Sequence, residues 1–446
     1  MSSTTLKRVG IGLGAGLGAL ALTTGAAFAA APPPDPLNSG DTAWMITSSA
    51  LVLLMTIPGL ALFYAGMVRK KNMLATAAQS FGATAIISVL WMIIGYSVAF
   101  TTNKDSNLNQ FIGSFDQFML FNMSLKSINP LAGTIPESVY MFFQMTFAII
   151  TPALIAGAIA DRMKFSAFMW FMSLWLLLIY CPIAHWVWGG GWLGTLGALD
   201  YAGGTVVHLN AGTAGLVACL MLGKRVGYGT ENMAPHNLLF ALIGASLLWV
   251  GWFGFNAGSA VTAGYNAGMA AAATQIATAA AALGWMFSEW IISGKPSVLG
   301  MISGAVAGLV AITPASGFVD GLGGLIIGVS AGVVCYIASV WVKKLLGYDD
   351  ALDTWGVHGV GGALGAMMTG AFAKNAINSS SKGWLFDGNP HQMLIQFYDV
   401  AAVFVYCGIG TFIILKVIDM IVGIRVSQEV EVEGLDINLH GEAIHG

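Results

Sequence analysis

Charged residues are scarce in this chain. Lysine and arginine number 18 and aspartate and glutamate 21, so charged residues make up only 9% of the 446 residues. Soluble domains carry about 25%, so the composition excludes a soluble enzyme or binding domain as the main architecture. The formal net charge of −3 gives no reason to expect a nucleic acid or another highly charged partner.

Cysteine is also rare. The four cysteines are Cys181, Cys219, Cys335 and Cys407, and no two of them form a C-x-x-C pair. Each lies inside or at the end of an apolar segment. We therefore interpret them as small buried hydrophobic residues.

Apolar residues are correspondingly abundant. They make up 57% of the chain, and the mean hydropathy is +0.76. A membrane-spanning helix needs about 20 residues, and charged or turn residues divide the sequence into eleven apolar segments. These are 43–68, 75–100, 138–160, 165–184, 205–222, 237–256, 263–292, 299–313, 322–346, 356–373 and 392–422. The sequence thus predicts an all-α integral membrane protein with eleven transmembrane helices.

The first 30 residues have the pattern of a signal peptide. Lys7 and Arg8 precede an apolar run over residues 11–22, and Ala27-Phe28-Ala29 fits a cleavage site. Residues 31–422 then form the membrane domain. Export places the mature N-terminus outside, and eleven crossings place the tail, residues 423–446, in the cytoplasm.

Lysine and arginine placement agrees with this orientation, because positive residues collect in short cytoplasmic loops. The predicted inside positions are Arg69, Lys70, Lys71, Arg162, Lys164, Lys224, Arg225, Lys295, Lys343, Lys344 and Arg425. The outside loops hold Lys104, Lys126, Lys374 and Lys382.

Short matches indicate an internal repeat. Phe-Tyr-Ala-Gly at 63–66 resembles Phe-Asn-Ala-Gly at 255–258, and Ala-Leu-Asp occurs at 198–200 and again at 351–353. We expect one repeat over about 43–222 and a second over about 237–373, with 392–422 as span eleven. Five spans per copy is an odd number, so the second copy must be inverted, with the functional centre and a central pore between the two.

Two histidines lie inside apolar segments, where an unpartnered polar group is costly. His208 follows Asp200 by eight residues and His358 follows Asp353 by five, which places the imidazoles roughly 12 and 8 Å in from opposite ends of their helices. We expect the two rings to meet near the bilayer centre. The alternative for each is a hydrogen bond to a backbone carbonyl.

Asp200 and Asp353 precede helices that begin with small residues, so both are expected to be helix N-caps. A metal site is the competing interpretation of the histidines. Zinc in catalytic sites has three protein ligands, and no third ligand is evident at this depth, so no metal is expected.

Aromatic residues cluster near the expected outer ends of three segments. The clusters contain Phe143 and Phe147, Trp188, and Phe255 with Ser259. Such residues often form interfacial belts. If Phe147, Trp188 and Ser259 instead face one vestibule, ring faces and a hydroxyl would make a site for a small cation.

Longer motifs occur in a characteristic order. They are Trp-Gly-Gly-Gly at 188–191, Gly-Trp-Phe-Gly-Phe-Asn-Ala-Gly-Ser at 251–259 and Gly-Val-His-Gly at 356–359, together with the twin histidines. With these motifs the sequence closely resembles the Amt/Mep/Rh ammonium transporters, specifically the bacterial Amt branch. The resemblance covers essentially the whole mature chain, from Asp41 to Asp436.

The resemblance implies roles for the candidate residues. By position, Phe147, Trp188 and Ser259 match an external ammonium recruitment site, and Asp200 matches its supporting aspartate. Phe143 or Phe147 with Phe255 matches a stacked phenyl gate. His208, His358 and Trp252 match the lining of a narrow pore. It implies a transporter of ammonium, and also of methylammonium, that is no enzyme and needs no cofactor. The expected location is the bacterial inner membrane.

The resemblance also implies partners. It predicts a homotrimer with one pore in each protomer. Residues 434–442, Gly-Leu-Asp-Ile-Asn-Leu-His-Gly-Glu, match the family's cytoplasmic tail and suggest docking of a PII-type signal protein.

Two questions stay open at this stage. Ammonium could be deprotonated so that ammonia alone passes, or the proton could follow through the histidines and make uptake electrogenic. An alternative function is an ammonium sensor that signals to a cytoplasmic partner, and a zinc-dependent intramembrane enzyme is a more remote one.

Overall fold

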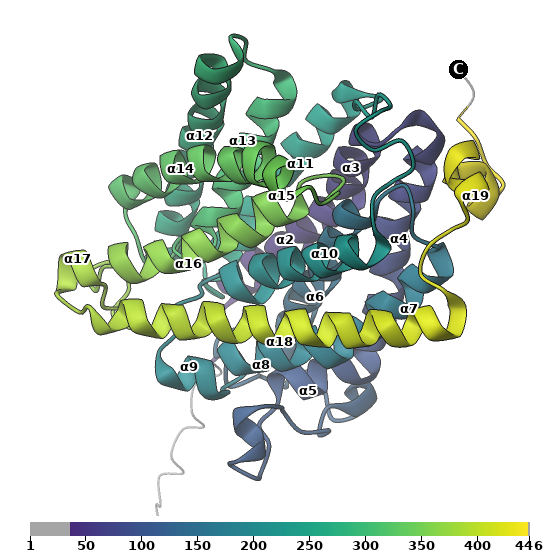
Figure 1. Ribbon diagram of the computed structural model, residues 1–446. Coiled ribbons are helices and arrows are strands. Elements are labelled where there is room, and N and C mark those ends of the chain that lie inside the picture. Colours follow the sequence, from purple (N-terminus) through teal and green to yellow (C-terminus); the bar gives the residue numbers. More distant parts are fainter. Residues whose placement is uncertain (1–35, 445–446) are drawn as a thin grey trace, which may run out of the picture. The chain divides into compact units, whose positions relative to one another are not determined.

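The computed structural model describes residues 36–444 as helices joined by loops (Figure 1). Within these residues no β-strand forms, and the only pairing of that type is an isolated bridge between Met163 and Arg425. The all-α prediction is therefore confirmed for the described part of the chain. The predicted signal peptide, residues 1–30, lies outside the described residues.

The helices of the first half cover the five segments predicted there. They are α2 (Ser39–Leu54), α3 (Ala61–Met67), α4 (Met73–Leu90), α5 (Tyr96–Phe100), α6 (Glu137–Ile159), α7 (Phe165–Trp175), α8 (Cys181–Val187), α9 (Trp192–Leu196) and α10 (Asn210–Leu222). Short π-helical segments join several of them, namely η1 (Met55–Leu60), η3 (Trp91–Gly95), η6 (Leu176–Tyr180) and η7 (Gly204–Leu209). These junctions keep the helices continuous across each predicted segment.

The second half has the same construction. Its helices are α11 (Leu238–Gly258), α12 (Tyr265–Ser293), α13 (Val298–Ile312), α14 (Gly321–Tyr336), α15 (Lys343–Leu346), α16 (Val360–Phe372), α17 (Trp384–Asp387), α18 (His391–Val422) and α19 (Gln428–Glu433). Its π-helical segments are η8 (Ile337–Val342), η9 (Trp355–Gly359) and η10 (Asp436–His440). The two histidines thus both lie in π-helical segments, His208 in η7 and His358 in η9.

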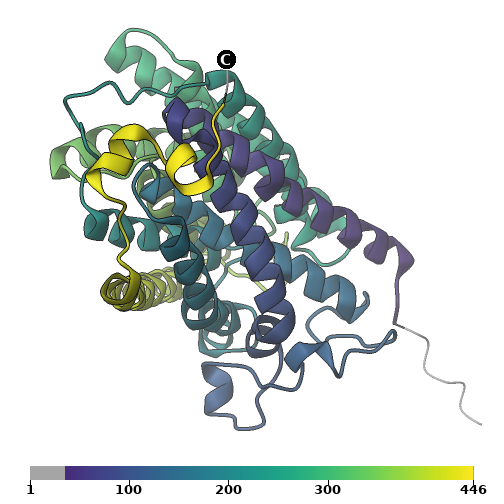
Figure 2. The same cartoon turned by 90° about the vertical axis from the view of Figure 1, so that its right-hand side faces the viewer.

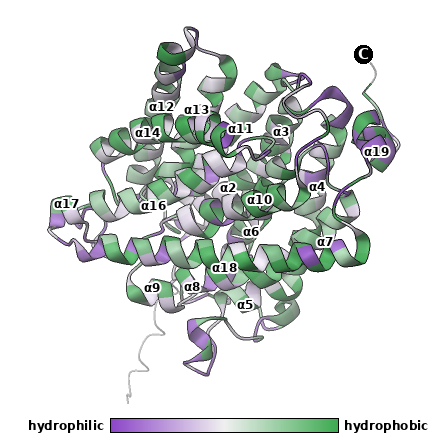
Figure 3. Cartoon of the chain, in the orientation of Figure 1, coloured by the Kyte–Doolittle hydropathy of each residue, from purple (hydrophilic) through white to green (hydrophobic). Residues whose placement is uncertain are grey.

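Nine helical segments between residues 36 and 444 are long and apolar enough to cross a membrane. They are Ser39–Met67, Lys70–Phe100, Glu137–Ile159, Phe165–Leu196, Gly204–Leu222, Leu238–Gly258, Tyr265–Ser293, Gly321–Leu346 and His391–Val422. Hydrophobic residues follow these helices in Figure 3, whereas hydrophilic ones gather at loops and around α19. The predicted segment 299–313 is a shorter apolar helix, and 356–373 is helical as η9 and α16 but is not one of these nine, so the count of eleven crossings stays a prediction.

Side-chain caps explain where several long helices begin. Asn38 accepts a hydrogen bond at the start of α2, Asn237 at α11, Ser297 at α13 and Asp320 at α14. Each caps one of the backbone N–H groups that a helix leaves without an internal partner.

Faces of α13 and α14 that carry glycines pack against α12. A Cβ on Gly308 would lie 2.5 Å from the Ala281 Cβ, and one on Gly328 would lie 2.3 Å from the Ala277 carbonyl oxygen. Only glycine allows backbones to approach this closely, which is how helices gain van der Waals contact in lipid.

The two halves meet where the histidines lie, because α10 packs against η9 and α16 packs against η7. A Cβ on Gly212 would lie 2.2 Å from the Gly359 nitrogen, and a Cβ on Gly362 would lie 2.5 Å from the Gly204 carbonyl oxygen and 3.1 Å from the His208 Cβ. Gly212 follows His208 by four residues, as Gly362 follows His358. Each half therefore presents a glycine to the histidine segment of the other.

The C-terminal segment lies against the start of α4 (Figure 2). The Asp436 carboxylate accepts hydrogen bonds from the N–H groups of Leu74 at 3.1 Å and Ala75 at 2.8 Å, and the Leu435 N–H donates to the Asn72 side chain at 2.8 Å. Asp436 thus stabilises the N-terminus of α4 from a segment far away in the sequence.

Candidate functional site

Asp200 organises the start of the segment that carries His208. Its carboxylate accepts hydrogen bonds from the N–H groups of Gly203 at 2.7 Å, Gly204 at 2.6 Å, Thr205 at 2.9 Å and Val206 at 3.1 Å. The Asp200 residue is 5% exposed. This is the arrangement expected of a helix cap, with more donors than a single cap usually has.

The prediction that Asp353 caps the second helix is wrong. Asp353 has a φ of +59° and its carboxylate pairs with the Lys343 ammonium group. Asp350 is the cap, because it accepts from the N–H groups of Thr354 at 3.1 Å and Trp355 at 2.7 Å. Asp350, five residues before the first residue of η9, can point back to the first N–H groups of the helix, whereas Asp353 in the left-handed region is turned away from them.

Burial first, and then the negative charge of Asp353, raise the pKa of Asp350 to about 6. Asp350 precedes His358 by eight residues, which is the spacing between Asp200 and His208. Sequence analysis missed Asp350 because the Ala-Leu-Asp match pointed to Asp353, although the equal spacing was visible in the sequence.

The two histidines meet. Their Nδ1 atoms are 3.2 Å apart and their rings stack, with centroids separated by 5.3 Å and planes inclined by 23°. His208 is 1% exposed and His358 4% exposed. A hydrogen bond between two Nδ1 atoms needs one of them to carry the proton and the other to accept it.

Trp252 also packs against the His208 ring. Its ring stacks on the imidazole at 5.3 Å and 20°, and its Nε1 donates to the Thr313 hydroxyl at 2.9 Å. The rings of Trp252, His208 and His358 therefore follow one another in contact, and the hydrogen bond to Thr313 fixes the orientation of Trp252.

Further aromatic rings extend this series of ring contacts beyond His208. Phe147 and Phe255 stack with centroids 4.1 Å apart and planes inclined by 21°, and Phe255 lies 5.9 Å from the His208 ring. Phe143 contacts Phe147 at 4.9 Å, and Trp188 meets Phe147 edge to face at 5.9 Å. The predicted phenyl pair is thus adjacent to the histidine pair.

A cavity of about 280 Å³ lies on the far side of the phenyl pair from the histidines. Phe147, Trp188, Ser259 and Phe143 line it together with Gln144. The predicted recruitment residues therefore face one space. The Ser259 hydroxyl donates to the Phe255 carbonyl at 2.8 Å, which leaves its own lone pairs free to accept.

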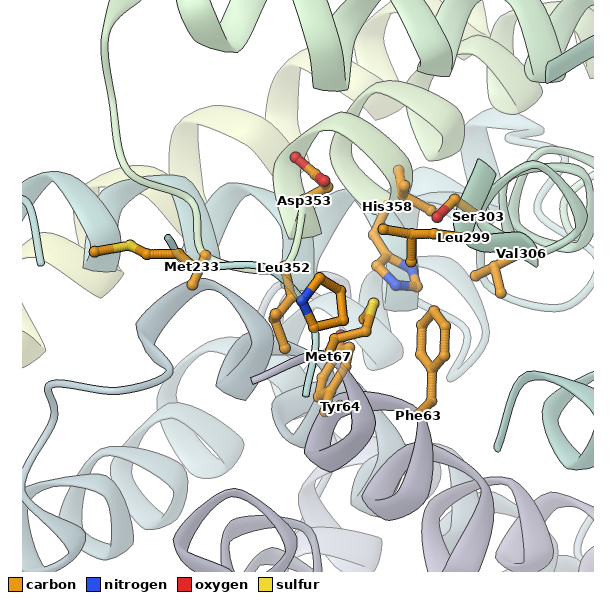
Figure 4. Close-up of a pocket in the computed structure, with 13 residues that line it drawn as sticks. Phe63, Tyr64, Met67, Met233, Leu299, Ser303, Val306, Leu352, Asp353 and His358 are labelled. Atoms are coloured by element: carbon orange, nitrogen blue, oxygen red, sulfur yellow. The ribbon is translucent and has the colours of Figure 1, made fainter. Parts of the chain in front are cut away.

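A smaller cavity of about 120 Å³ lies at the other end of this series of ring contacts. His358, Asp353, Phe63 and Leu352 are among its lining residues (Figure 4). Two cavities are thus separated by a continuous series of ring contacts from Phe147 through Phe255 and His208 to His358.

Asp200 is connected to the first cavity through its backbone. Its carbonyl oxygen accepts a hydrogen bond from the Trp188 Nε1 at 2.8 Å. The capped turn therefore also fixes one wall of the cavity.

Sequence analysis also missed a second buried acid. Asp399 on α18 is 0% exposed and lies against the Thr205 hydroxyl, with oxygen distances of 3.0 and 3.2 Å. The available signal was an acidic residue inside the apolar segment 392–422. No group of three or more metal-ligating side chains occurs between residues 36 and 444.

Comparison with known proteins now identifies the family. The Ammonium Transporter Family matches residues 43–444. An ammonium transporter of Bacillus subtilis is 48% identical over 406 residues, which cover 91% of this chain and 98% of the relative.

Solved structures agree. Mep2 of Saccharomyces cerevisiae has a TM-score of 0.81 at 36% identity and covers 88% of each chain. A structure titled Sensor Amt Protein has a TM-score of 0.81 at 28% identity and covers 90% of this chain and 98% of its own. With its paired histidines between two cavities and this match across its length, the chain belongs to the ammonium transporter family.

Proposed function

We propose that the protein takes up ammonium from outside a bacterial cell and conducts it as ammonia past the histidine pair. Ammonium is recruited in the cavity lined by Phe147, Trp188 and Ser259, where ring faces and a hydroxyl oxygen replace part of its water shell. Asp200 adds negative potential to this end of the path.

The observation that carries this proposal is the position of the two ring pairs. Phe147 and Phe255 are in stacked contact, and the buried His208 and His358 follow directly. A bare cation would lose tens of kcal/mol of idealised solvation energy in such apolar surroundings, whereas neutral ammonia loses far less. Ammonium therefore gives up its proton at or beyond the phenyl pair, and ammonia hydrogen-bonds the imidazoles as it passes.

We further propose that the proton follows through the histidines, so that uptake is electrogenic. The direct Nδ1 to Nδ1 contact of 3.2 Å supports this, because it offers one acceptor and one donor in line. Methylammonium is expected to be a second substrate.

The membrane arrangement proposed is eleven crossings in two inverted five-helix repeats plus α18, with residues 1–30 as signal peptide and the tail in the cytoplasm. Equal spacing of Asp200 to His208 and Asp350 to His358 supports the repeat, as does the reciprocal placement of Gly212 and Gly362. The protein would reside in the inner membrane.

We propose a homotrimer and a PII-type partner. Many large apolar side chains on α12 and α14 are exposed, including Ile291 at 83% and Leu322 at 54%, and a neighbouring protomer or lipid must cover them in a membrane. The alternative function, an ammonium sensor, is supported by the likeness to the structure titled Sensor Amt Protein.

The test is an ammonium concentration jump on proteoliposomes that contain the purified protein, with current and internal pH recorded together. The electrogenic version predicts an inward current that His208→Ala and His358→Ala abolish or strongly reduce. A pH change without current would leave ammonia conduction but refute electrogenic uptake. Neither signal, from protein that is folded, would favour the sensor.

A further inference from the structure

Asp399 is a buried acid that the proposed path does not use. It lies in α18, is 0% exposed, and its hydrogen-bond partner within residues 36–444 is the hydroxyl of Thr205, which is itself fully buried. The inference below rests on the proposed function for its transport consequence, but its chemical part stands alone.

Hydrogen-bond counting around Thr205 shows which groups carry protons. Its hydroxyl oxygen lies 2.8 Å from the Asp200 carboxylate and 3.0 Å from that of Asp399. A hydroxyl has one hydrogen to donate and two lone pairs to accept. It can therefore donate to one of the two acids and must accept from the other.

The two acids differ in their other partners. Four backbone N–H groups point at Asp200, which is the environment of an anion. An anionic Asp399 would have at most the single Thr205 hydrogen, with a second anion just across that hydroxyl. Burying a charge with so few donors is strongly unfavourable.

We propose that Asp399 is a neutral, protonated positioning residue of the outer ammonium site. Its carboxyl O–H donates to the Thr205 hydroxyl, which donates to the Asp200 carboxylate. Since the Asp200 carbonyl accepts from the Trp188 Nε1 at 2.8 Å, this chain runs from α18 to the wall of the cavity.

The chain also reaches the histidine pair. Thr205 and His208 belong to the same π-helical segment, η7, and α18 packs directly against it. Removal of the Asp399 donor leaves Thr205 free to turn away from Asp200. The outer site then loses its fixed geometry, while the protein keeps its fold through the other contacts of α18.

The direct test is infrared difference spectroscopy of the purified protein at neutral pH. Asp399→Asn should remove one protonated-carboxyl C=O band that shifts in heavy water. Asp116→Asn, in an exposed loop, is the matched control and should leave this region unchanged. Absence of any lost band in Asp399→Asn overturns the proposal.

Transport tests the positioning role. Asp399→Asn keeps a neutral donor, so its half-saturating ammonium concentration should stay within about twofold of wild type. Asp399→Leu has similar bulk but no donor, and should raise that concentration several-fold with a smaller change in maximal current. Thr205→Val should have the same effect, and the double variant should be no worse than either single one, because both break one chain.

Two results would contradict the positioning role. One is an Asp399→Asn variant as impaired as Asp399→Leu, and the other is additive effects of Asp399→Leu and Thr205→Val. If the wild-type protein shows no ammonium current, the proposed function is refuted instead. The infrared result would still decide the protonation of Asp399.

Discussion

The contact between Gly212 and η9 allows a quantitative prediction for Gly212→Ala. The added Cβ would lie 2.2 Å from the Gly359 nitrogen and 2.4 Å from its Cα, whereas ordinary contact begins at 3.4 Å. Both neighbours are backbone atoms and cannot rotate away. The two segments must therefore separate by about 1 Å, as estimated from these distances and the stiffness of packed cores.

That separation acts directly on the histidines. Their Nδ1 atoms are 3.2 Å apart, and a further 1 Å or so takes them beyond hydrogen-bonding distance. Overpacking of this kind costs about 1–3 kcal/mol of stability, and misplacement of a functional group by about 1 Å can lower a rate roughly 100-fold. We expect the maximal ammonium current of Gly212→Ala to fall by about 10- to 100-fold, with a modest decrease in Tm.

The assay is the current on proteoliposomes, normalised to the amount of folded protein and paired with thermal unfolding in detergent. Gly408→Ala is the control, because its Cβ would meet only the Thr213 side chain at 3.7 Å. It replaces glycine by alanine in a helix packed on α10 and should conduct normally. Normal current and Tm in Gly212→Ala would refute the idea that this close approach fixes the histidine pair.

Three further predictions concern single side chains. The pKa of Asp350 is raised from 3.8 to about 6, so the folded state binds more protons than the unfolded state between these values, and this contribution to stability is lost as pH rises through that window. The Tm of wild type minus the Tm of Asp350→Asn should therefore decrease between pH 4 and 7. A constant difference would contradict the raised pKa of Asp350. Trp252→Phe keeps a ring on His208 but loses the hydrogen bond to Thr313, so its maximal current should fall about fivefold, the equivalent of about 1 kcal/mol. The maximal current of Trp252→Leu should fall further. Equal maximal currents in wild type and both variants would show that the ring contact with His208 is irrelevant. Ser259→Ala removes an acceptor for a cation and should raise the half-saturating ammonium concentration about tenfold without changing the maximal current. Thr262→Ala removes a nearby hydroxyl that does not line the cavity, and it should leave the half-saturating concentration unchanged.

Much of the fold was predictable because apolar runs and their breaks are local properties. All eleven predicted segments are helical, and their limits agree with the structure within a few residues. The segment predicted at 165–184 ends three residues later, at Val187, where a turn over residues 188–191 precedes α9.

The site was predictable where a residue type contradicted its surroundings. His208 and His358 stood out as polar residues in apolar segments, and the predicted inverted repeat led us to expect their contact. Asp353 was misassigned because a short tripeptide match carried more weight than the distance to the histidine. The role of Gly212 could not be seen from the sequence, since it depends on which backbone lies opposite.

The stacked rings of Phe147 and Phe255 have a consequence for the energy economy of the cell. Ring centroids 4.1 Å apart leave no room for water between them. Protons cross membranes rapidly along unbroken chains of hydrogen-bonded water, and on the proposed path these rings would interrupt any such chain. A protein that conducts along this proposed path could therefore remain in an energised membrane at high copy number without dissipating the proton-motive force.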